Sequence, residues 1–378
     1  ATAVSAGITT ILMGLVTNYP FALASGMGLN AMFAFAVAPV AGWEAALGVV
    51  FISGILFFVL SIMGIIDYID AAIPASLKRA TAAGIGLFIA FIGLKNAGII
   101  VGDEATIVAL GDLSQPETFL AIIGLLIMAV LMAKKVRGAI LLGILLTTVV
   151  SFFMGITAFP TSLSDIFGAP ASLAPIAFHM DLPGALRMGF MTVFAFAFVD
   201  IFDTLGTLMG TGARADFLDK EGRLPKIKEA MIVDAIGTVL GAVLGTSTVT
   251  TYVESTAGVS EGGRSGLTAV VAGVLFLASL FLAPLAGLVP SGATAPALVI
   301  VGVLMMGAVM DIDFTDFTEA FPAFVTMLFM PFAFSIADGI AAGFLAYPIV
   351  KVVAGRNKEV HWFTYILALV ALVHFVFK

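Results

Sequence analysis

The chain has 378 residues, of which 61% are hydrophobic and 11% charged, and its mean hydropathy is +1.16. This composition excludes a water-soluble protein and indicates a polytopic all-α membrane protein. The net charge of −7 says little about binding partners, because charge distribution among loops sets membrane orientation. Cysteine is absent and there are only three histidines, so we expect no disulfide, no metal site and no cofactor.

Apolar segments long enough to cross a bilayer follow one another along the chain, so we expect a single membrane domain over residues 1–378. We place them at 2–18, 21–40, 44–66, 79–99, 117–133, 137–157, 185–210, 228–246, 249–264, 266–289, 293–309, 317–335 and 337–354. The sequence leaves open whether a last apolar stretch, 361–377, spans the membrane or lies in its interface. Residue 1 is Ala within an apolar segment, so we expect the natural N-terminus, and at least one helix, to be missing.

Basic residues fall in every second connector. They are Lys78, Arg79, Lys134, Lys135 and Arg137, the stretch 214–228, Arg264, and the stretch 351–358. The intervening connectors carry acidic residues, with Arg187 the one exception. By the positive-inside rule, the basic connectors face the cytoplasm, and we expect a multi-pass protein of the plasma (inner) membrane.

Two segments depart from the lipid-facing pattern: NYPFALASGMGLNAMFAF (18–35) and GTSTVTTYVESTAGV (245–259). In each, a short run without helical character precedes a glycine-bearing helix. We expect extended backbone at 21–25 and 249–254. Because unpaired backbone groups cannot face lipid, these runs must pair with protein or line a cavity.

A weak internal repeat accompanies these segments. RGAILLGILL (137–146) resembles DGIAAGFLAY (338–347), and each closes one half of the chain. The halves cover about 1–157, lacking its first helix, and 185–354, and an odd number of spans in each makes them an inverted repeat. Such repeats place a substrate site where broken helices meet. The alternative is that Gly and Pro merely kink two ordinary helices.

Acidic residues inside apolar segments are the main candidates for a binding site, since such residues are costly at membrane depth unless used. Glu254 follows the second extended run, where it could accept two parallel hydrogen bonds or merely cap a helix. Asp200 and Asp203 share one side of a helix at i and i+3, and like charges so placed make a proton carrier. We expect Asp200 at the ligand and Asp203 in a structural or coupling role, and we read Asp234 as a structural partner.

Further residues adjoin the expected cavity. Phe33 and Phe198 could stack on a flat ring, and Asn30 could bind a ligand or hold the first extended run. The small or hydroxyl-bearing candidates are Gly26, Gly28, Thr251 and Ser255.

The motifs PFALASGMGLNAMFA, FVDIFDTLGTLMG and GTSTVTTYVESTAGVSEGGRSGLTA resemble the AzgA-like purine permeases of the nucleobase:cation symporter-2 superfamily. The resemblance covers nearly the whole chain. It implies two inverted repeats of seven helices, a core and a gate domain, and short antiparallel strands in the two broken helices. It also implies uptake of hypoxanthine, guanine or adenine with protons, using Asp200, Glu254 and the backbone from Gly26 to Asn30. The chain departs from the family at Ser25, where Pro is common, and uracil-transporting relatives carry His where this chain has Thr204.

The leading hypothesis is therefore a secondary transporter, not an enzyme, that takes up purine nucleobases with protons by alternating access. Glu254, Asp200 and Asp203 are its proton-coupling candidates, and Na⁺ is the less expected cation. Alternatives are a carrier of uracil, xanthine or an anion with the same fold and, remotely, an intramembrane aspartyl protease using Asp200 and Asp338. The expected partners are the nucleobase, H⁺ and the lipid bilayer, without nucleic acid; a homodimer is left open.

Overall fold

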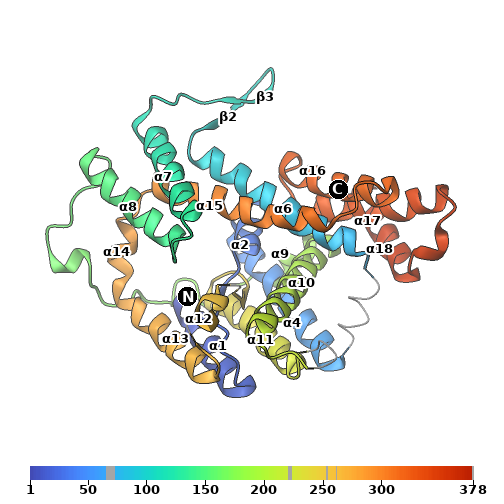
Figure 1. Ribbon diagram of the computed structural model, residues 1–378, viewed down its shortest axis with the longest axis horizontal. Helices are drawn as coiled ribbons and strands as arrows, with labels where there is room; N and C mark the ends of the chain where they lie inside the picture. Colours follow the sequence, from blue (N-terminus) through green and yellow to red (C-terminus); the bar gives the residue numbers. More distant parts are fainter. Residues whose placement is uncertain (65–72, 220–223, 253, 261, 377–378) are drawn as a thin grey trace.

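The computed structural model covers residues 1–378 and describes all of them except 65–72, 220–223, 253, 261 and 377–378 (Figure 1). The first half of the chain is mostly helical. Its elements are α1 (Thr2–Thr17), β1 (Leu23–Ser25), α2 (Met27–Ala31), the π-helix η1 (Met32–Val37), α3 (Ala38–Ala41), α4 (Trp43–Met63), α6 (Ala75–Asn96), β2 (Ile100–Asp103), β3 (Ile107–Leu110), α7 (Pro116–Ala133), α8 (Ala139–Phe153) and η2 (Leu163–Asp165).

The second half has a similar content. Its elements are α9 (Leu182–Arg187), α10 (Phe190–Arg214), α11 (Ile227–Leu244), β4 (Val249–Thr251), α12 (Ser255–Ser260), α13 (Gly266–Ala278), η3 (Ser279–Leu282), α14 (Ala283–Gly287), α15 (Ser291–Met305), η4 (Met306–Asp311), α16 (Phe317–Phe332), α17 (Ile336–Val353), η5 (Asn357–Glu359) and α18 (Trp362–Val376).

Seven helical stretches among the described residues are long and apolar enough to cross a bilayer, and shorter apolar helices accompany them. The expected fold class, a helical membrane protein with two strand-bearing broken helices, is confirmed. Most predicted segments match a helix within about four residues. The segments 21–40 and 249–264 are instead divided between a strand and short helices, and the helix that begins at Gly266 ends at Ala278 rather than near 289. The segment 185–210 is a correction: α9 ends at Arg187, Gly189 adopts a φ of +83°, and α10 begins only at Phe190. A left-handed glycine ends the first helix and redirects the chain.

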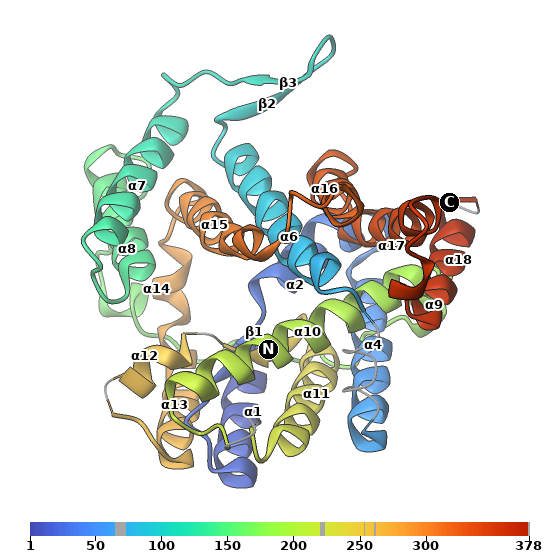
Figure 2. The same cartoon turned by 45° about the vertical axis from the view of Figure 1, so that its right-hand side comes forward.

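The helices form two bundles (Figure 2). We call α1, α2, α4, α10, α11, α12 and α13, together with β1 and β4, the strand-bearing bundle. The second bundle contains α6, α7, α8, α15, α16 and α17, and α18 packs mainly against α17. Aromatic contacts join the bundles: the Phe198 ring of α10 lies 5.6 Å from the Phe344 ring of α17.

The packing repeats itself between the two halves of the chain, as an inverted repeat requires. In the strand-bearing bundle α1 packs on α13, and α11 packs on α4. In the second bundle α7 packs on α8 and on α15, while α16 packs in the same way on α17 and on α6. Equivalent elements also meet each other: β1 with β4, α1 with α11, and α6 with α15. The sequence boundaries of the halves, 1–157 and 185–354, stay a prediction.

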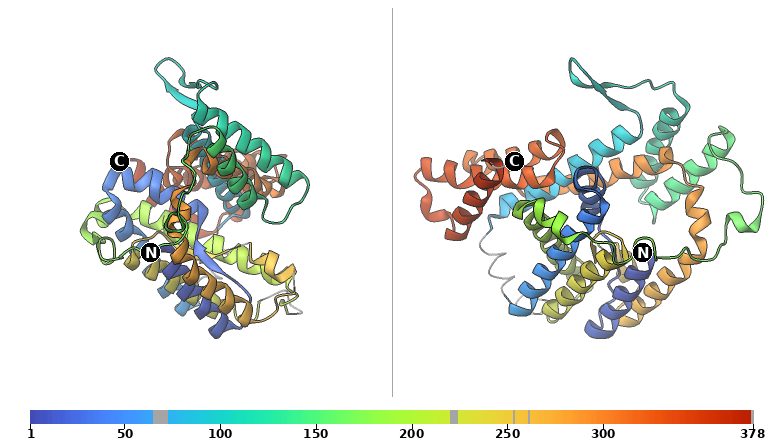
Figure 3. Two further views of the ribbon diagram at one scale, coloured as in Figure 1. Left: turned by 90° about the vertical axis from the view of Figure 1, so that its left-hand side faces the viewer. Right: turned by 180° about the vertical axis from the view of Figure 1, so that it is seen from behind.

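The β2–β3 hairpin was not predicted. Its register runs from Ile100 opposite Leu110 to Asp103 opposite Ile107. It projects away from the helices and connects α6 to α7 (Figure 1 and Figure 3). From the charge pattern of the connectors we expect the hairpin on the outer side of the membrane.

Candidate functional site

The two broken helices cross through a short antiparallel ladder. Leu23 pairs with Thr251, Ala24 with Thr250 and Ser25 with Val249, and all six residues are buried. The ladder is extended at both ends, because the Gly26 N–H donates to the Thr248 carbonyl at 3.1 Å and the Tyr252 N–H to the Ala22 carbonyl at 2.9 Å. The predicted extended runs are thus confirmed, and their backbone groups pair inside the protein.

The helices that follow β1 and β4 start at different points of the ladder. α2 begins after the end of β1, and α12 begins after the end of β4. Because the strands are antiparallel, these helices start at opposite ends of the ladder, about 10 Å apart at about 3.3 Å per residue. The arrangement places Gly26 at one end and Glu254 at the other.

Hydroxyl and amide groups fasten β1. The Thr10 hydroxyl accepts from the Leu23 N–H at 2.8 Å and donates to its carbonyl at 2.9 Å. The Ser25 hydroxyl donates to Asn30 Oδ1 at 2.6 Å, and the Ser247 hydroxyl donates to the same oxygen. Of the two roles expected for Asn30, the geometry supports that of holding the extended run.

A carboxylate fastens β4. Asp234 is completely buried and accepts from the Thr251 N–H at 2.7 Å and the Thr251 hydroxyl at 2.6 Å. The Thr204 hydroxyl of α10 donates to its other oxygen at 2.9 Å and also bonds Thr250. Asp234 therefore ties α11, α10 and β4 together, which agrees with the structural role expected for it. These donors suit an ionised carboxylate.

Asp200 is also completely buried, but its hydrogen bonding is incomplete. Thr238 donates to Oδ2 at 2.7 Å, whereas Oδ1 has no hydrogen-bond partner among the described residues. An ionised carboxylate with so few donors is costly in a protein interior, so this geometry favours the neutral acid. Thr238 also lies 3.5 Å from the Val249 carbonyl, which connects Asp200 to β4.

Asp203, one turn further along α10, has an exposed side chain, and so does Glu254. The two carboxylates are close enough to interact electrostatically, and Tyr252 is close to both. The Tyr252 hydroxyl donates to the Ser25 carbonyl at 2.6 Å. The structure thus brings Glu254, Asp203 and Tyr252 together near one end of the ladder.

The remaining predicted residues have packing or fastening contacts. Phe198 is 3% exposed, and its ring lies 4.6 Å from that of Phe202. Phe33 is half-buried against the main hydrophobic core. A Cβ at Gly28 would lie 2.9 Å from Ile85 of α6, so this glycine permits close approach of the two bundles.

At the ladder itself, a Cβ on Gly26 would lie 2.7 Å from Thr250. Ser255 accepts from the Ala22 N–H at 3.0 Å, which joins the start of α12 to β1. Sequence reasoning missed Tyr252 and Thr238. Thr238 follows Asp234 by four residues on the same face of α11, and that spacing was the available signal.

Two cavities lie away from the ladder. One, of about 530 Å³, lies between the bundles and is lined by residues of η1, α10, α17 and α18, including Asp338 and His374, which are 2.8 Å apart. The other, of about 300 Å³, lies where α1 ends. None of the predicted site residues lines either cavity.

Residues 1–342 match a protein family described as the Permease family. The chain belongs to this permease family. It is a multi-pass membrane transporter rather than an enzyme, so the protease alternative is rejected.

Several relatives of the permease are similar over its whole length. A putative permease of Methanocaldococcus jannaschii is 52% identical, covering 100% of this chain and 86% of the relative. The guanine/hypoxanthine permease PbuG of Bacillus subtilis is 45% identical, with coverages of 100% and 86%. The adenine permease AdeP of Escherichia coli is 42% identical, with coverages of 100% and 84%.

Among solved structures, the transmembrane domain of the cyanobacterial bicarbonate transporter BicA matches with a TM-score of 0.65 and 17% identity. The match covers 90% of this chain and 88% of that domain. At this identity the likeness shows the fold alone.

Proposed function

We propose that this permease takes up purine nucleobases across the plasma membrane, coupled to protons, by alternating access between its two bundles. The names of its relatives support the substrate class, since they include permeases for adenine and for guanine or hypoxanthine. The observation that carries the proposal is the grouping of Glu254, Asp203 and Tyr252 around the ladder, next to the buried and incompletely bonded Asp200.

Glu254 is the proposed acceptor for the base. Its side chain is exposed at the end of the ladder, and a carboxylate can accept two parallel N–H bonds from one edge of a planar ring. A neutral base suits this environment, because Asp203 and Glu254 would repel an anion. The anion-carrier alternative is therefore disfavoured, although an anion transporter shares the fold.

Asp200 is the proposed proton carrier. Its burial and the unpaired Oδ1 favour the neutral acid in the present conformation. A change in solvent access to this oxygen, as the bundles move, would allow the proton to leave. Asp203 lies close to Glu254 and is proposed to couple proton and base electrostatically.

The bundles supply the proposed moving parts. The ladder, with Glu254 and Asp200, belongs to the strand-bearing bundle, so the site moves as one unit. The second bundle contacts it through close packing such as Gly28 on Ile85 and Phe198 on Phe344. Alternating access would exchange these contacts on the two sides of the site.

The test is uptake of labelled guanine, hypoxanthine or adenine into proteoliposomes that contain the purified protein, driven by a pH gradient. Competition by unlabelled purines but not by uracil is expected, and xanthine tests the nearest alternative. Glu254→Gln is expected to abolish uptake, because the amide presents one acceptor in place of two, while the exposed control Glu117→Gln transports normally. Normal uptake by Glu254→Gln would remove this residue from the site. Uptake that needs a Na⁺ gradient and ignores pH would contradict proton coupling.

A further inference from the structure

The 300 Å³ cavity lies where three connectors of the strand-bearing bundle meet. Two of these connectors carry basic residues, which by the positive-inside rule assigns the cavity to the cytoplasmic side. Thr17 is the last residue of α1, and Asn18 and Tyr19 come from the link between α1 and β1. Phe217, Pro225 and Lys226 come from the link between α10 and α11, and Arg264 comes from the link between α12 and α13. These links lead directly into the elements that carry the ladder, Asp200 and Glu254. A ligand in the cavity would touch all three links.

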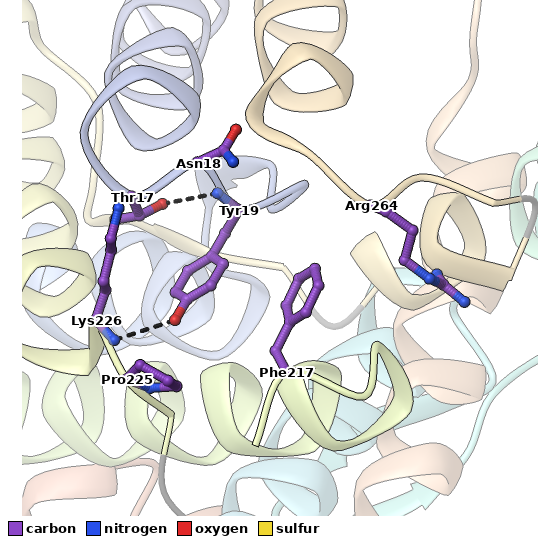
Figure 4. A pocket seen from close by; sticks show the side chains of 7 residues that line it. All are labelled: Thr17, Asn18, Tyr19, Phe217, Pro225, Lys226 and Arg264. Atoms are coloured by element: carbon purple, nitrogen blue, oxygen red, sulfur yellow. Dashed lines mark hydrogen bonds between the residues drawn. The ribbon is translucent and has the colours of Figure 1, made fainter. Parts of the chain in front are cut away.

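The aromatic part of the cavity is a stack of rings. The Tyr19 and Phe217 rings lie 5.3 Å apart at an angle of 20°, and Phe21 lies 5.0 Å from Tyr19. The backbone N–H of Lys226 donates to the Tyr19 hydroxyl at 3.1 Å, which holds the tyrosine ring in position (Figure 4). Such a stack offers an apolar surface to a further planar ring.

The polar part of the cavity is cationic. Lys226 and Arg264 both have exposed side chains, and among the described residues that line the cavity none carries a carboxylate. In Figure 4, Lys226 borders Tyr19 on one side, and Arg264 lies on the other side beyond Phe217. Arg264 Nη1 donates to the Val259 carbonyl at 2.6 Å, which orients the guanidinium and leaves further N–H groups for an anion.

We propose that this cavity binds a purine nucleoside monophosphate from the cytoplasm, with the base against Phe217 and the phosphate on Arg264. The inference rests on the proposed function, because such a nucleotide is the ribose 5-phosphate derivative of the base that is taken up. A neutral base would leave the Arg264 guanidinium without an anionic partner, and inorganic phosphate would leave the Phe217 ring without a stacking partner. The volume falls at the lower end of the range for small-molecule pockets, about 300–1,000 Å³.

Binding would slow uptake by holding the three links together. The link after α1 continues into β1, and the link after α12 follows the helix that Glu254 precedes. A nucleotide that bridges them stabilises one conformation of the strand-bearing bundle. A ligand that binds one conformation better shifts the population toward it, so rising nucleotide levels would reduce import.

The first experiment measures binding without transport. Guanosine monophosphate is added to the purified full chain in detergent, and the melting temperature is recorded, with guanosine and inorganic phosphate at the same concentrations in parallel. Only the nucleotide is expected to raise the melting temperature. Arg264→Gln and Phe217→Leu are each expected to weaken the nucleotide's apparent affinity by about tenfold. Arg264→Gln removes a charge-assisted hydrogen bond to the phosphate, and Phe217→Leu removes the ring contact with the base. Lys134→Gln, an exposed cation on another cytoplasmic connector, is the matched control.

The second experiment tests sidedness. Guanosine monophosphate is expected to inhibit labelled purine uptake in inside-out membrane vesicles and not in right-side-out vesicles, and Arg264→Gln is expected to relieve the inhibition while leaving basal uptake unchanged. No nucleotide-dependent melting shift, or a shift unaltered by both variants, would overturn the proposal. So would phosphatidylglycerol reproducing the shift and displacing the nucleotide, because the ligand would then be a lipid headgroup. Since the melting assay needs no transport, its failure is distinct from a failure of purine uptake.

Discussion

Replacing Asp234 tests whether one carboxylate holds strand β4 in place. In Asp234→Leu, the Thr251 N–H loses its acceptor while it stays buried, which costs about 1–3 kcal/mol. The hydrogen bonds from the Thr251 and Thr204 hydroxyls to a charged group are also lost, although Thr204 can still bond Thr250. Together these losses predict about 3–6 kcal/mol of destabilisation.

Asp234→Asn should be much milder. Its carbonyl oxygen can keep both bonds from Thr251, and its amide group can donate to the Thr204 hydroxyl, which then donates to Thr250. Only the contribution of the negative charge to these hydrogen bonds is lost, and we expect Asp234→Asn to destabilise the protein by about 1–2 kcal/mol.

The measurement is the free energy of unfolding in mixed micelles, titrated with sodium dodecyl sulfate and followed by circular dichroism. Asp203→Asn is the matched control, because this exposed aspartate lies near Glu254 and its loss removes a repulsion rather than a bond. We expect the control to be at least as stable as the wild type. If the free energy of unfolding of Asp234→Leu lies within about 1 kcal/mol of the wild-type value, Asp234 does not hold strand β4 in place.

Two further predictions concern stability. A Cβ at Gly266 would lie far inside contact distance of the Gly14 backbone, so Gly266→Ala should force α1 and α13 apart and lower the melting temperature. Gly287 has open space around it, so Gly287→Ala should leave the melting temperature unchanged. Equal effects of the two substitutions would show that α1 and α13 do not depend on this close contact. The Arg356 hydrogen bond lowers the pKa of Glu359 from 4.5 to about 2, so this carboxylate contributes stability above pH 4.5 that is lost as the pH falls through 2. The melting temperature of Glu359→Gln should therefore lie below that of the wild type at pH 7 and converge with it near pH 2; a constant gap would contradict the ion pair.

The sequence predicted the extended runs of the ladder because extended backbone within an apolar protein favours residue types other than those of a lipid-facing helix. Serine, threonine and glycine replace leucine at 18–35 and 245–259, and extended runs form at 23–25 and 249–251, as expected. The pairing itself joins residues more than 220 positions apart, and no local pattern encodes its register. Only the symmetry of the inferred repeat and the resemblance to purine permeases gave a reason to bring the two runs together.

The sequence could not divide the roles of the acidic residues. Asp200 and Asp203 are separated by one helical turn, and both lie in an apolar segment, yet one is completely buried and the other exposed. The difference depends on which neighbours cover each side of α10, which is a property of tertiary packing. Asp234 was correctly read as a structural partner, but its particular donors, on β4 and α10, became visible only once the ladder was assembled.

The Thr238 hydroxyl offers a physical link between the proposed proton and the proposed base. It has a single proton and two neighbouring acceptors, Asp200 Oδ2 at 2.7 Å and the Val249 carbonyl at 3.5 Å. While Asp200 is ionised, the hydroxyl must donate to it. Once Asp200 carries a proton, it can itself donate to Thr238, whose hydroxyl then becomes available to strand β4. Strand β4 ends at Thr251, shortly before Glu254 in the chain. A change in the protonation of Asp200 would therefore alter the hydrogen bonding of Thr238 to β4, and through β4 the position of Glu254. No large rearrangement is needed between the two carboxyl groups.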